Sequence, residues 1–256
     1  QTFIYFLLTN RNKHLYIYMS SKYFILSKNE NNLVDDNNDN NIVLLNGLTF
    51  ILPANNIVYY TSNGLFENRL IEWCKQFCDK SQNILDIGAH TGTYSLCLSN
   101  HCKNVYAFEP QRMTYYSLCG SIALSNKSNI IPHNYGLGSP VQKGKTPLFI
   151  ISEDGGGSTI QPIEEEQIIR TEYIETRTLD EFRFTDINFI KLDVENNELD
   201  VLKGGINTII NNNFPKILFE SNTTNPELFD YITNTLKYKN IISIYGTNNM
   251  FLATTD

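Results

Sequence analysis

The residues best suited to bind a ligand lie where the apolar run Asn83–Ile87 enters a glycine-rich turn. Glycine adopts backbone angles that other residues avoid, and it lets the main chain approach a ligand closely. Taken alone, the turn also fits an ordinary connection between a strand and a helix, since short glycine motifs have many false positives. The candidate ligand-binding residues are Asp86, Gly88, His90, Gly92, Tyr94 and Ser95.

Two carboxylates narrow the choice of ligand. Asp86 immediately precedes the turn, where dinucleotide-binding folds place a glycine, and a carboxylate there suits an amino or sulfonium cation. Glu109 ends the next apolar run, Val105–Phe108, and follows Gly88 by 21 residues. From that position an acid accepts hydrogen bonds from both hydroxyls of a ribose. A ribose with a cationic tail predicts S-adenosylmethionine as the cofactor.

Three further polar residues are predicted to contact this cofactor. Tyr94 and Ser95 open the following helix, where hydroxyls and backbone N–H groups can meet its carboxylate. Asn134 lies near the end of the third apolar run and is a candidate contact for the adenine. Its neighbour His133 is expected to be structural, because a lone histidine there is more often a satisfied group than a base.

Charged residues mark the end of a later apolar run, Asn188–Val194. Side chains alternate along a strand, so Lys191, Asp193 and Glu195 are expected to share one face at the carboxyl edge of the sheet. Glu220 ends the next predicted strand at the same edge. If the acceptor is a hydroxyl, as the family resemblance given below implies, we predict that Asp193 removes its proton, as base or as orienting acceptor. Lys191 would keep a neighbouring carboxylate ionised, and Glu195 and Glu220 would bind acceptor hydroxyls.

Two other interpretations of this charged cluster stay open. Lys191 can form an ion pair that only closes the strand ends, since structural ion pairs also bring titratable groups together. The carboxylates of Asp193, Glu195 and Glu220 are also chemically suited to Mg²⁺. A count of carboxylates does not establish a metal, so none is predicted.

The elements that must position these residues form two parts. Residues 1–62 are predicted to be a β-rich N-terminal region, and residues 63–256 a domain in which strands and helices alternate. Such alternation predicts an α/β fold with a parallel sheet and helices on both faces. Residues 140–178 interrupt it and are expected to form a long irregular insertion with a lid or acceptor-binding loop.

The boundaries of these elements follow from the apolar patterns. The predicted strands are Phe3–Leu8, Leu15–Met19, Tyr23–Leu26, Ile42–Leu45, Leu48–Leu52, Asn83–Ile87, Asn104–Phe108, Ile130–Tyr135, Asn188–Val194 and Lys216–Phe219. The predicted helices are Asn68–Phe77, Thr93–Ser99, Met113–Leu124, Glu198–Ile210 and Pro226–Leu236.

Four blocks, in this order, resemble the FkbM-type methyltransferases. They are Asp86-Ile-Gly-Ala-x-x-Gly-x-x-Ser95, Ala107-Phe-Glu-Pro110, Ile190-Lys-Leu-Asp-Val-Glu195 and Pro215-x-Ile-Leu-Phe-Glu220. The resemblance implies an S-adenosylmethionine-dependent O-methyltransferase on a Rossmann-like class I methyltransferase sheet, with sugars, glycolipids or polyketide-derived hydroxyls as acceptors. Pro110 belongs to the second block and is assigned with it to the cofactor site. His90 stands where the family usually has Asn, and Asn196 where it usually has Gly.

The composition excludes other classes of protein. The 256 residues carry 20 Lys+Arg against 27 Asp+Glu, a net charge of −7, so neither a nucleic-acid partner nor polybasic membrane contact is expected. No apolar run reaches the roughly 18 residues of a membrane-spanning helix. The five cysteines are odd in number and contain no CxxC, which predicts reduced thiols in a cytoplasm-like compartment.

We therefore predict an O-methyltransferase that acts on a hydroxyl of a sugar, a glycan or a related small molecule. A nicotinamide-dependent reductase is disfavoured, because the spacing Tyr18-x-x-x-Lys22 precedes the glycine turn instead of following it. An RNA 2′-O-methyltransferase would share the sheet but should show a basic surface. A non-catalytic cofactor-binding module is the third alternative, and intact Asp86, Glu109 and Asp193 speak against it.

Overall fold

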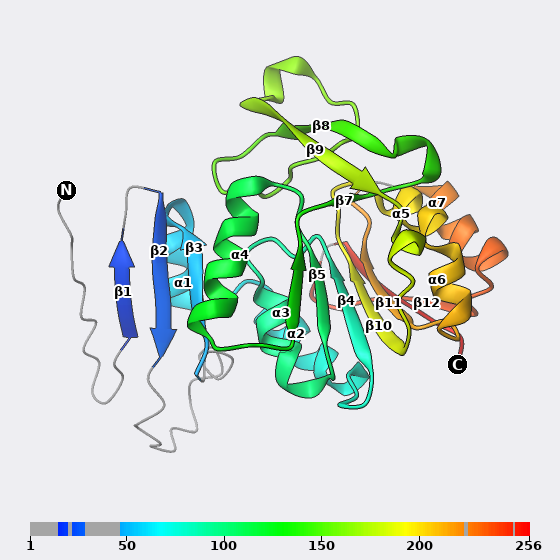
Figure 1. Cartoon of the computed structure of the whole chain (residues 1–256), viewed down its shortest axis with the longest axis horizontal. Helices are drawn as coiled ribbons and strands as arrows, with labels where there is room; N and C mark the ends of the chain where they lie inside the picture. The colour runs from blue at the N-terminus through cyan, green and yellow to red at the C-terminus, as the bar shows by residue number, and fades with distance from the viewer. Residues whose placement is uncertain (1–14, 20–21, 29–46, 223–224, 248) are drawn as a thin grey trace.

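The computed structural model describes residues 15–19, 22–28, 47–222, 225–247 and 249–256. A seven-stranded sheet forms the centre of the molecule (Figure 1). A three-stranded N-terminal sheet lies beside helix α4 (Arg112–Leu124), and a second three-stranded sheet lies over the carboxyl ends of the central strands. The predicted strands Phe3–Leu8 and Ile42–Leu45 lie outside the described residues.

The central sheet reverses its winding direction in the middle. Its order is β12-β13-β11-β10-β4-β5-β6, and β4 pairs in parallel with β5 on one side and with β10 on the other. Only β13 runs antiparallel to its two neighbours. Ligands of open α/β sheets bind beyond the carboxyl ends of strands at such a reversal. The strands are β4 (Asn83–Ile87), β5 (Val105–Phe108), β6 (Ile130–His133), β10 (Ile187–Leu192), β11 (Lys216–Glu220), β12 (Asn240–Ser243) and β13 (Met250–Thr254).

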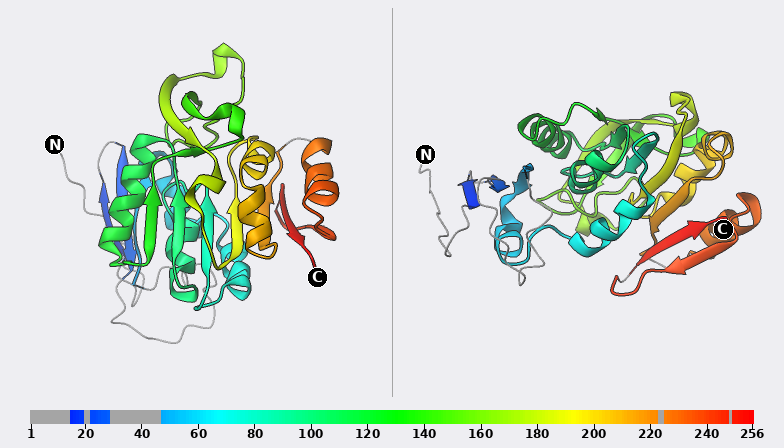
Figure 2. Two further views of the ribbon diagram at one scale, coloured as in Figure 1. Left: turned by 45° about the vertical axis from the view of Figure 1, so that its right-hand side comes forward. Right: turned by 90° about the horizontal axis from the view of Figure 1, so that it is seen from below.

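Helices cover both faces of this sheet (Figure 2), as the sequence predicts. Alternate strand residues enter different hydrophobic clusters: Ile84 packs with α2, α3 and α4, whereas its neighbour Leu85 packs with α5, α6 and α7. The remaining helices are α1 (Ile57–Asn63), α2 (Asn68–Cys74), α3 (Thr93–Leu98), α5 (Glu198–Gly204), α6 (Ile206–Asn211) and α7 (Pro226–Asp230). The α/β fold with a Rossmann-like sheet is therefore confirmed.

The N-terminal sheet is joined to α4 by serine side chains. It consists of β1 (Leu15–Met19), β2 (Tyr23–Lys28) and β3 (Thr49–Pro53), in that order. The backbone N–H groups of Thr49 and Ile51 donate to the Oγ atoms of Ser125 and Ser121, each at 2.8 Å. These hydroxyls satisfy the free edge of β3, which would otherwise be open to another chain. Helix α1 then interrupts the β-rich region predicted for residues 1–62, and the boundary at 62 stays a prediction.

The insertion at residues 140–178 is not irregular, so that expectation was wrong. β7 (Gly136–Leu137), β8 (Gly144–Ile150) and β9 (Arg170–Arg177) form a sheet in the order β7-β9-β8. Its apolar cluster is small, with Leu148, Ile150 and Ile174 as its buried members, so these strands carry only a weak apolar pattern in the sequence. The connection between β8 and β9 carries Gly155–Ser158 back to the carboxyl edge of the central sheet.

The predicted helix Glu198–Ile210 is broken into two. α5 ends at Gly204, α6 begins at Ile206, and Gly205 separates them. A Cβ atom on Gly204 would lie 2.0 Å from the carbonyl oxygen of Gly138, so only glycine allows α5 to approach this backbone. Among the described residues, no helix combines the length and apolar character that a membrane crossing requires.

We expect the substitution Gly204→Ala to destabilise the protein. Helix propensity alone would favour alanine by about 1 kcal/mol. The contact with the Gly138 backbone should outweigh this gain, because overpacking against atoms that cannot move typically costs about 1–3 kcal/mol. Urea unfolding measures the difference. Gly156→Ala is the control, since its Cβ would meet Asp154 Oδ1 at an ordinary 3.4 Å. A Gly204→Ala protein as stable as the parent would contradict this packing.

Candidate active site

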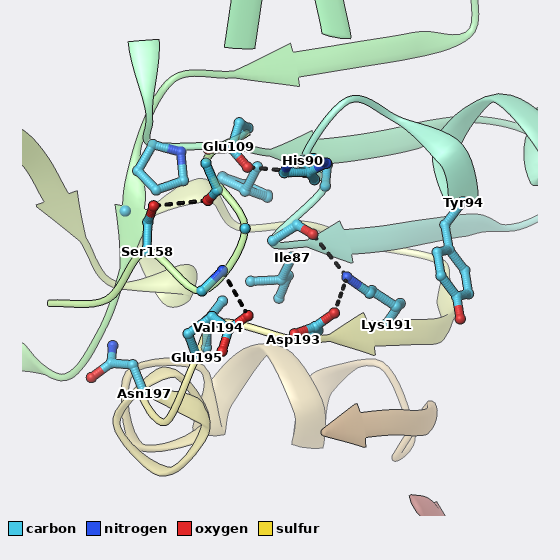
Figure 3. A pocket seen from close by; sticks show the side chains of 18 of the residues that line it. Ile87, His90, Tyr94, Glu109, Ser158, Lys191, Asp193, Val194, Glu195 and Asn197 are labelled. Atoms are coloured by element: carbon cyan, nitrogen blue, oxygen red, sulfur yellow. Dashed lines mark hydrogen bonds and ion pairs between the residues drawn. The ribbon is translucent and has the colours of Figure 1, made fainter. Parts of the chain in front are cut away.

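A cavity of about 400 Å³ opens at the carboxyl ends of β4, β5 and β10 (Figure 3). It lies at the reversal point of the sheet, and its volume falls within the range of small-molecule sites, about 300–1,000 Å³. The predicted site residues that line it are Gly88, His90, Tyr94, Glu109, Pro110, Lys191, Asp193 and Glu195. The predicted residues that do not line it are Asp86, Gly92, Ser95, Asn134 and Glu220.

The turn after β4 forms one wall of the cavity. Gly88 has φ +79°, and a Cβ there would fall 1.7 Å from the carbonyl oxygen of Asp193. The backbone N–H groups of Gly88 and Ala89 donate to the carbonyl of Phe108 at 3.0 and 2.8 Å, which ties the turn to β5. His90 adopts φ +50°, a left-handed angle that is uncommon outside glycine and that Asn, Asp and His adopt more readily than other residues. The turn therefore presents main-chain atoms to the cavity, with no side chain at Gly88.

Glu109 is buried at the end of β5, and both its oxygens accept backbone hydrogen bonds. Oε2 accepts from the N–H of His90 at 2.9 Å, and Oε1 accepts from the N–H of Gln111 at 2.8 Å. Burial raises the pKa of Glu109 to about 7, and the two N–H donors oppose that shift. Two donors aimed at two oxygens favour the ionised carboxylate, whose remaining lone pairs can accept from a ligand.

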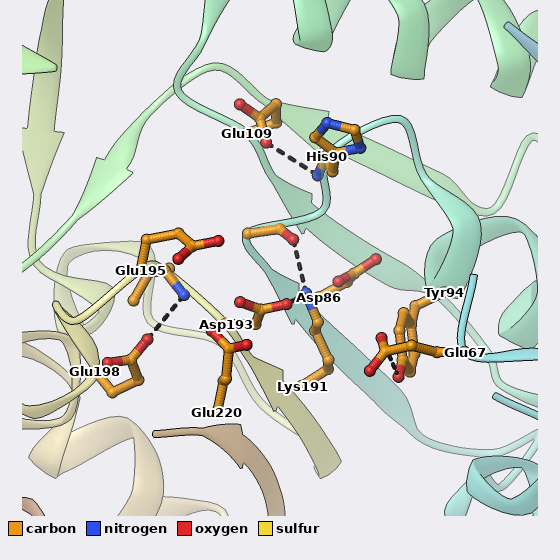
Figure 4. A network of polar contacts seen from close by, with 12 residues as sticks. Glu67, Asp86, His90, Tyr94, Glu109, Lys191, Asp193, Glu195, Glu198 and Glu220 are labelled. Atoms are coloured by element: carbon orange, nitrogen blue, oxygen red, sulfur yellow. Dashed lines mark hydrogen bonds and ion pairs between the residues drawn. The ribbon is translucent and has the colours of Figure 1, made fainter. Parts of the chain in front are cut away.

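Lys191 joins the two central strands beneath the cavity (Figure 4). Its Nζ donates to the carbonyl of Gly88 at 2.8 Å and forms an ion pair with Asp193 Oδ2 at 3.0 Å. Burial by itself would lower the pKa of Lys191, but the charges of Asp193 and Asp86 outweigh burial and raise the pKa. The lysine therefore stays protonated although it is only 4% exposed.

Asp86 lies below the cavity and not on its wall. It is 1% exposed, its Oδ2 accepts from Ser95 Oγ at 2.5 Å, and its Oδ1 has no hydrogen-bond partner among the described residues. Burial raises the pKa of Asp86, and the charge of Lys191 opposes this. The cavity lining therefore does not include Asp86, and its expected contact with a ligand cation stays a prediction. Ser95 is likewise buried, so its hydroxyl serves Asp86 instead of the cavity.

The expected row of three charges on one face of β10 is also corrected. The strand ends at Leu192, and Glu195 follows in a left-handed turn with φ +55°, where strand alternation no longer applies. Glu195 still reaches the cavity, and Glu220 approaches from β11, so that one oxygen each of Asp193, Glu195 and Glu220 lie within 4.8 Å of one another. Burial and the charges of Asp193 and Glu195 raise the pKa of Glu220 to about 9.

Three of the predicted cofactor contacts have other partners. Asn134 donates from Nδ2 to the carbonyls of Glu109 and Pro110 at 2.8 and 3.1 Å, so it fixes the turn after β5. Gly92 packs against α4, since a Cβ there would lie 2.5 Å from Leu118 Cδ1. Tyr94 lines the cavity, and its hydroxyl donates to Glu67 Oε2 at 3.0 Å. The roles assigned to these residues stay predictions.

The sequence does not predict several of the residues that line the cavity. Glu67 lies at the N-terminus of α2 with φ +54°, and burial raises its pKa. Asp154 in the β8–β9 connection accepts from Asn56 Nδ2 at 2.6 Å, and its carbonyl lies 3.0 Å from His90 Nε2. No motif marks Glu67 or Asp154, because only the folded chain brings them to the cavity. In the sequence, the Gly155–Ser158 segment interrupts the alternation of strands and helices. The sequence does not predict that this segment lines the cavity.

The architecture defines a class of protein. A sheet that reverses at its first parallel strand, a glycine turn and a buried acid after the next strand form a nucleoside site. The acidic surroundings suit a nucleoside with a cationic tail. These are features of the S-adenosylmethionine-dependent methyltransferases. The family model described as the methyltransferase FkbM domain matches residues 86–241, more than half of the chain. The chain therefore belongs to the FkbM methyltransferase family, and S-adenosylmethionine is its cofactor.

Individual relatives are distant. The hexuronic acid methyltransferase AglP of Haloferax volcanii is 26% identical over 155 residues, which cover 58% of this chain and 60% of AglP. The match thus spans less than two thirds of that relative. An rRNA methylase from Streptococcus thermophilus has a TM-score of 0.44 at 12% identity, covering 73% of this chain and 92% of that one. TrmK from M. capricolum, in complex with S-adenosylhomocysteine, has a TM-score of 0.40 at 12% identity, covering 72% and 65%.

The residues present fit this cofactor. The turn at Gly88 leaves no room for a Cβ, because the Asp193 carbonyl occupies that place, and the turn thereby exposes main-chain atoms to the cavity. Glu109 is held by two N–H donors in the form that accepts hydrogen bonds from a ribose. Glu67 adds a carboxyl group to the cavity wall, which suits a ligand with a cationic group.

We expect cofactor affinity to depend on pH through Glu109. Its pKa of about 7 means that the carboxylate is partly protonated below neutral pH, and a ribose diol needs the ionised form. The dissociation constant of S-adenosylhomocysteine should fall as the pH rises from 6 to 8, by at most about tenfold per pH unit. Isothermal titration calorimetry measures this dependence.

Substitution isolates the contribution of Glu109. Glu109→Gln should bind at least about tenfold more weakly and lose the pH dependence, because one amide N–H₂ would face a backbone N–H. The exposed Glu166→Gln should keep the parental profile. A Glu109→Gln protein with unchanged affinity would show that this acid does not hold the ribose.

We also expect Lys191→Met to destabilise the protein. Removal of the ammonium leaves Asp86 and Asp193 without their cation, and breaking a buried pair typically costs about 3–5 kcal/mol. Urea unfolding at pH 7 gives the change, and adding Asp86→Asn should recover part of it. Lys216→Met, which loses an exposed pair with Asp256, should change stability by about 1 kcal/mol or less. Equal losses at both lysines would contradict the central role of Lys191.

Proposed function

We propose that this domain transfers a methyl group from S-adenosylmethionine to a hydroxyl of a sugar or glycan. The observation that carries the proposal is the position of Asp193, a carboxylate on the cavity wall that is ion-paired with buried Lys191. The name of the relative AglP, a hexuronic acid methyltransferase, supports a sugar as acceptor. Aromatic side chains of Tyr60, Phe66 and Tyr135 on the cavity wall offer the apolar surface that the C–H face of a sugar ring needs.

Asp193 is the group that would take the proton from the acceptor hydroxyl. The cofactor would supply an electrophilic methyl group, whose S–CH₃ bond breaks as the O–CH₃ bond forms and S-adenosylhomocysteine leaves. The hydroxyl oxygen becomes a better nucleophile as its proton moves to the carboxylate. A positioned base typically contributes about 10²–10⁴-fold. Lys191 fixes the carboxylate and the Gly88 carbonyl together, so that the base and the cofactor turn keep one geometry.

The β8–β9 connection would exclude water and orient the acceptor. The Gly157 N–H donates to Glu195 Oε1 at 3.1 Å, and the Thr159 hydroxyl donates to the Glu195 carbonyl at 2.6 Å. On the opposite wall, His90 holds the carbonyl of Asp154. The connection thus spans the cavity between the cofactor turn and the acid cluster. Holding two reactants in line can supply roughly 7–11 kcal/mol of the barrier reduction.

The alternatives predicted from the sequence receive less support. RNA binding needs basic residues around the site, whereas Glu67, Asp154 and Glu195 surround this one. A non-catalytic module would not need a carboxylate held against the cavity by a buried lysine.

The five cysteines, all in the described part of the chain, form no disulfide, which supports the proposed reducing, cytoplasm-like compartment.

Asp193→Asn should separate binding from turnover. The variant should bind S-adenosylhomocysteine within about threefold of the parent, because the cofactor turn is unchanged, and lose about 10²–10⁴-fold in turnover. Labelled S-adenosylmethionine with a panel of sugars, nucleotide sugars and glycans, read by mass shift, measures transfer. Asp256→Asn removes an exposed carboxylate paired with Lys216 and should transfer at the parental rate. Parental turnover by Asp193→Asn would refute the role of Asp193 as base.

A further inference from the structure

Acidic side chains dominate the walls of the cavity. The lining carboxylates are Glu67, Glu109, Asp154, Asp193 and Glu195. They come from the start of α2, the end of β5, the β8–β9 connection and the end of β10, and Figure 4 shows Glu67, Glu109, Asp193 and Glu195 on different sides. Glu220 lies behind Asp193 and Glu195 and adds a further carboxyl group. An acceptor must enter among these groups.

The positively charged side chain on the cavity wall already has partners within the protein. Of the lining residues that the structure describes, Lys191 alone carries a permanent positive charge. Its ammonium is held between the Gly88 carbonyl and Asp193, and the residue is only 4% exposed. Burial lowers the pKa of His90, whose ring is engaged with the Asp154 carbonyl, so it is neutral near pH 7. Neither side chain offers a partner to an anion.

The cofactor does not remove this imbalance. Its sulfonium and ammonium groups against one carboxylate give a single net positive charge, which is fewer than the carboxylates that line the cavity. Burial and the charge of Asp193 already raise the pKa of Glu195. Ionisation of Glu195 is therefore less favourable in this site than in water. One more anion beside Glu195 would raise that cost, because like charges in a partly desolvated site repel strongly.

We propose that the cavity selects its acceptor by charge, taking neutral and amino sugars and rejecting uronic acids and sugar phosphates. The inference rests on the proposed function and names its substrate class, and it separates this chain from AglP, whose name gives an acidic sugar as acceptor. Glu195 is the specificity-determining residue: it lines the cavity across from Glu109 (Figure 3), and its Oε1 accepts from the Gly157 N–H. Glutamine at this position would retain an oxygen for Gly157 while losing the charge.

Matched sugar pairs test the selectivity. The pairs are the methyl glycosides of glucose and glucuronate, galactose and galacturonate, and mannose and mannuronate, with methyl glucosaminide as the cationic member. Methyl transfer is read by mass shift, and binding is read by calorimetry in the presence of S-adenosylhomocysteine. Within each pair of which the protein methylates at least one member, the neutral sugar should exceed its acid by at least about tenfold in kcat/KM and in affinity.

Two further measurements show whether the selectivity arises from charge or from the shape of the cavity. Raising the salt concentration from 0.05 to 0.5 M should reduce the ratio, because ions screen charge repulsion but not a steric clash. Glu195→Gln should reduce the ratio by about tenfold or more, whereas the exposed Glu166→Gln should leave it unchanged. Both responses together support selection by charge at Glu195.

The outcomes separate the two proposals. Transfer to uronic acids at a rate within tenfold of the neutral sugars, or a ratio unmoved by salt and by Glu195→Gln, overturns the inference and leaves the proposed function intact. Failure to bind or methylate any sugar or glycan overturns the proposed function and the inference with it.

Discussion

The ammonium group of Lys191 is the interaction on which the rest of the site depends. It connects β10 to the turn after β4 through the Gly88 carbonyl, and it neutralises Asp193 above and Asp86 below. A buried lysine is tolerated only when such partners outweigh the loss of water. The same contact that stabilises the core therefore sets the distance between the cofactor turn and the proposed base.

Backbone strain is concentrated around this contact. His90, Glu195 and Asn196 adopt positive φ angles, as Gly88 does, and all four lie where β4 and β10 leave the sheet. Such angles cost free energy and persist where surrounding contacts enforce them, commonly at functional sites. Here the Glu109 carboxylate holds the His90 N–H, and the Gly157 N–H holds Glu195. The strained segments thereby turn their polar groups toward one cavity.

The insertion encloses the carboxyl ends of the central strands, which the central sheet leaves open. β8 and β9 form a platform over the strand ends, and the segment between them brings Asp154 and Gly157 against the opposite walls of the cavity. The N-terminal sheet is tied to α4 by Ser121 and Ser125, and α1 then leads the chain to the cavity rim at Tyr60. The central strands thus supply Glu109, Asp193 and Glu195 to the cavity wall, and the insertion adds Asp154.

The sequence alone determined the α/β sheet, its two faces and the turn at Gly88, because apolar periodicity and glycine placement are local properties that short segments express. It also located the carboxylates of Glu109 and Asp193, which lie at strand ends that the same periodicity marks. Only the tertiary structure decided that Asp86 lies beneath the cavity, that Glu195 leaves the strand face, and that Glu67 and Asp154 join the wall. Those positions depend on contacts between segments far apart in the chain, where burial and neighbouring charges, not local pattern, set the direction of each side chain.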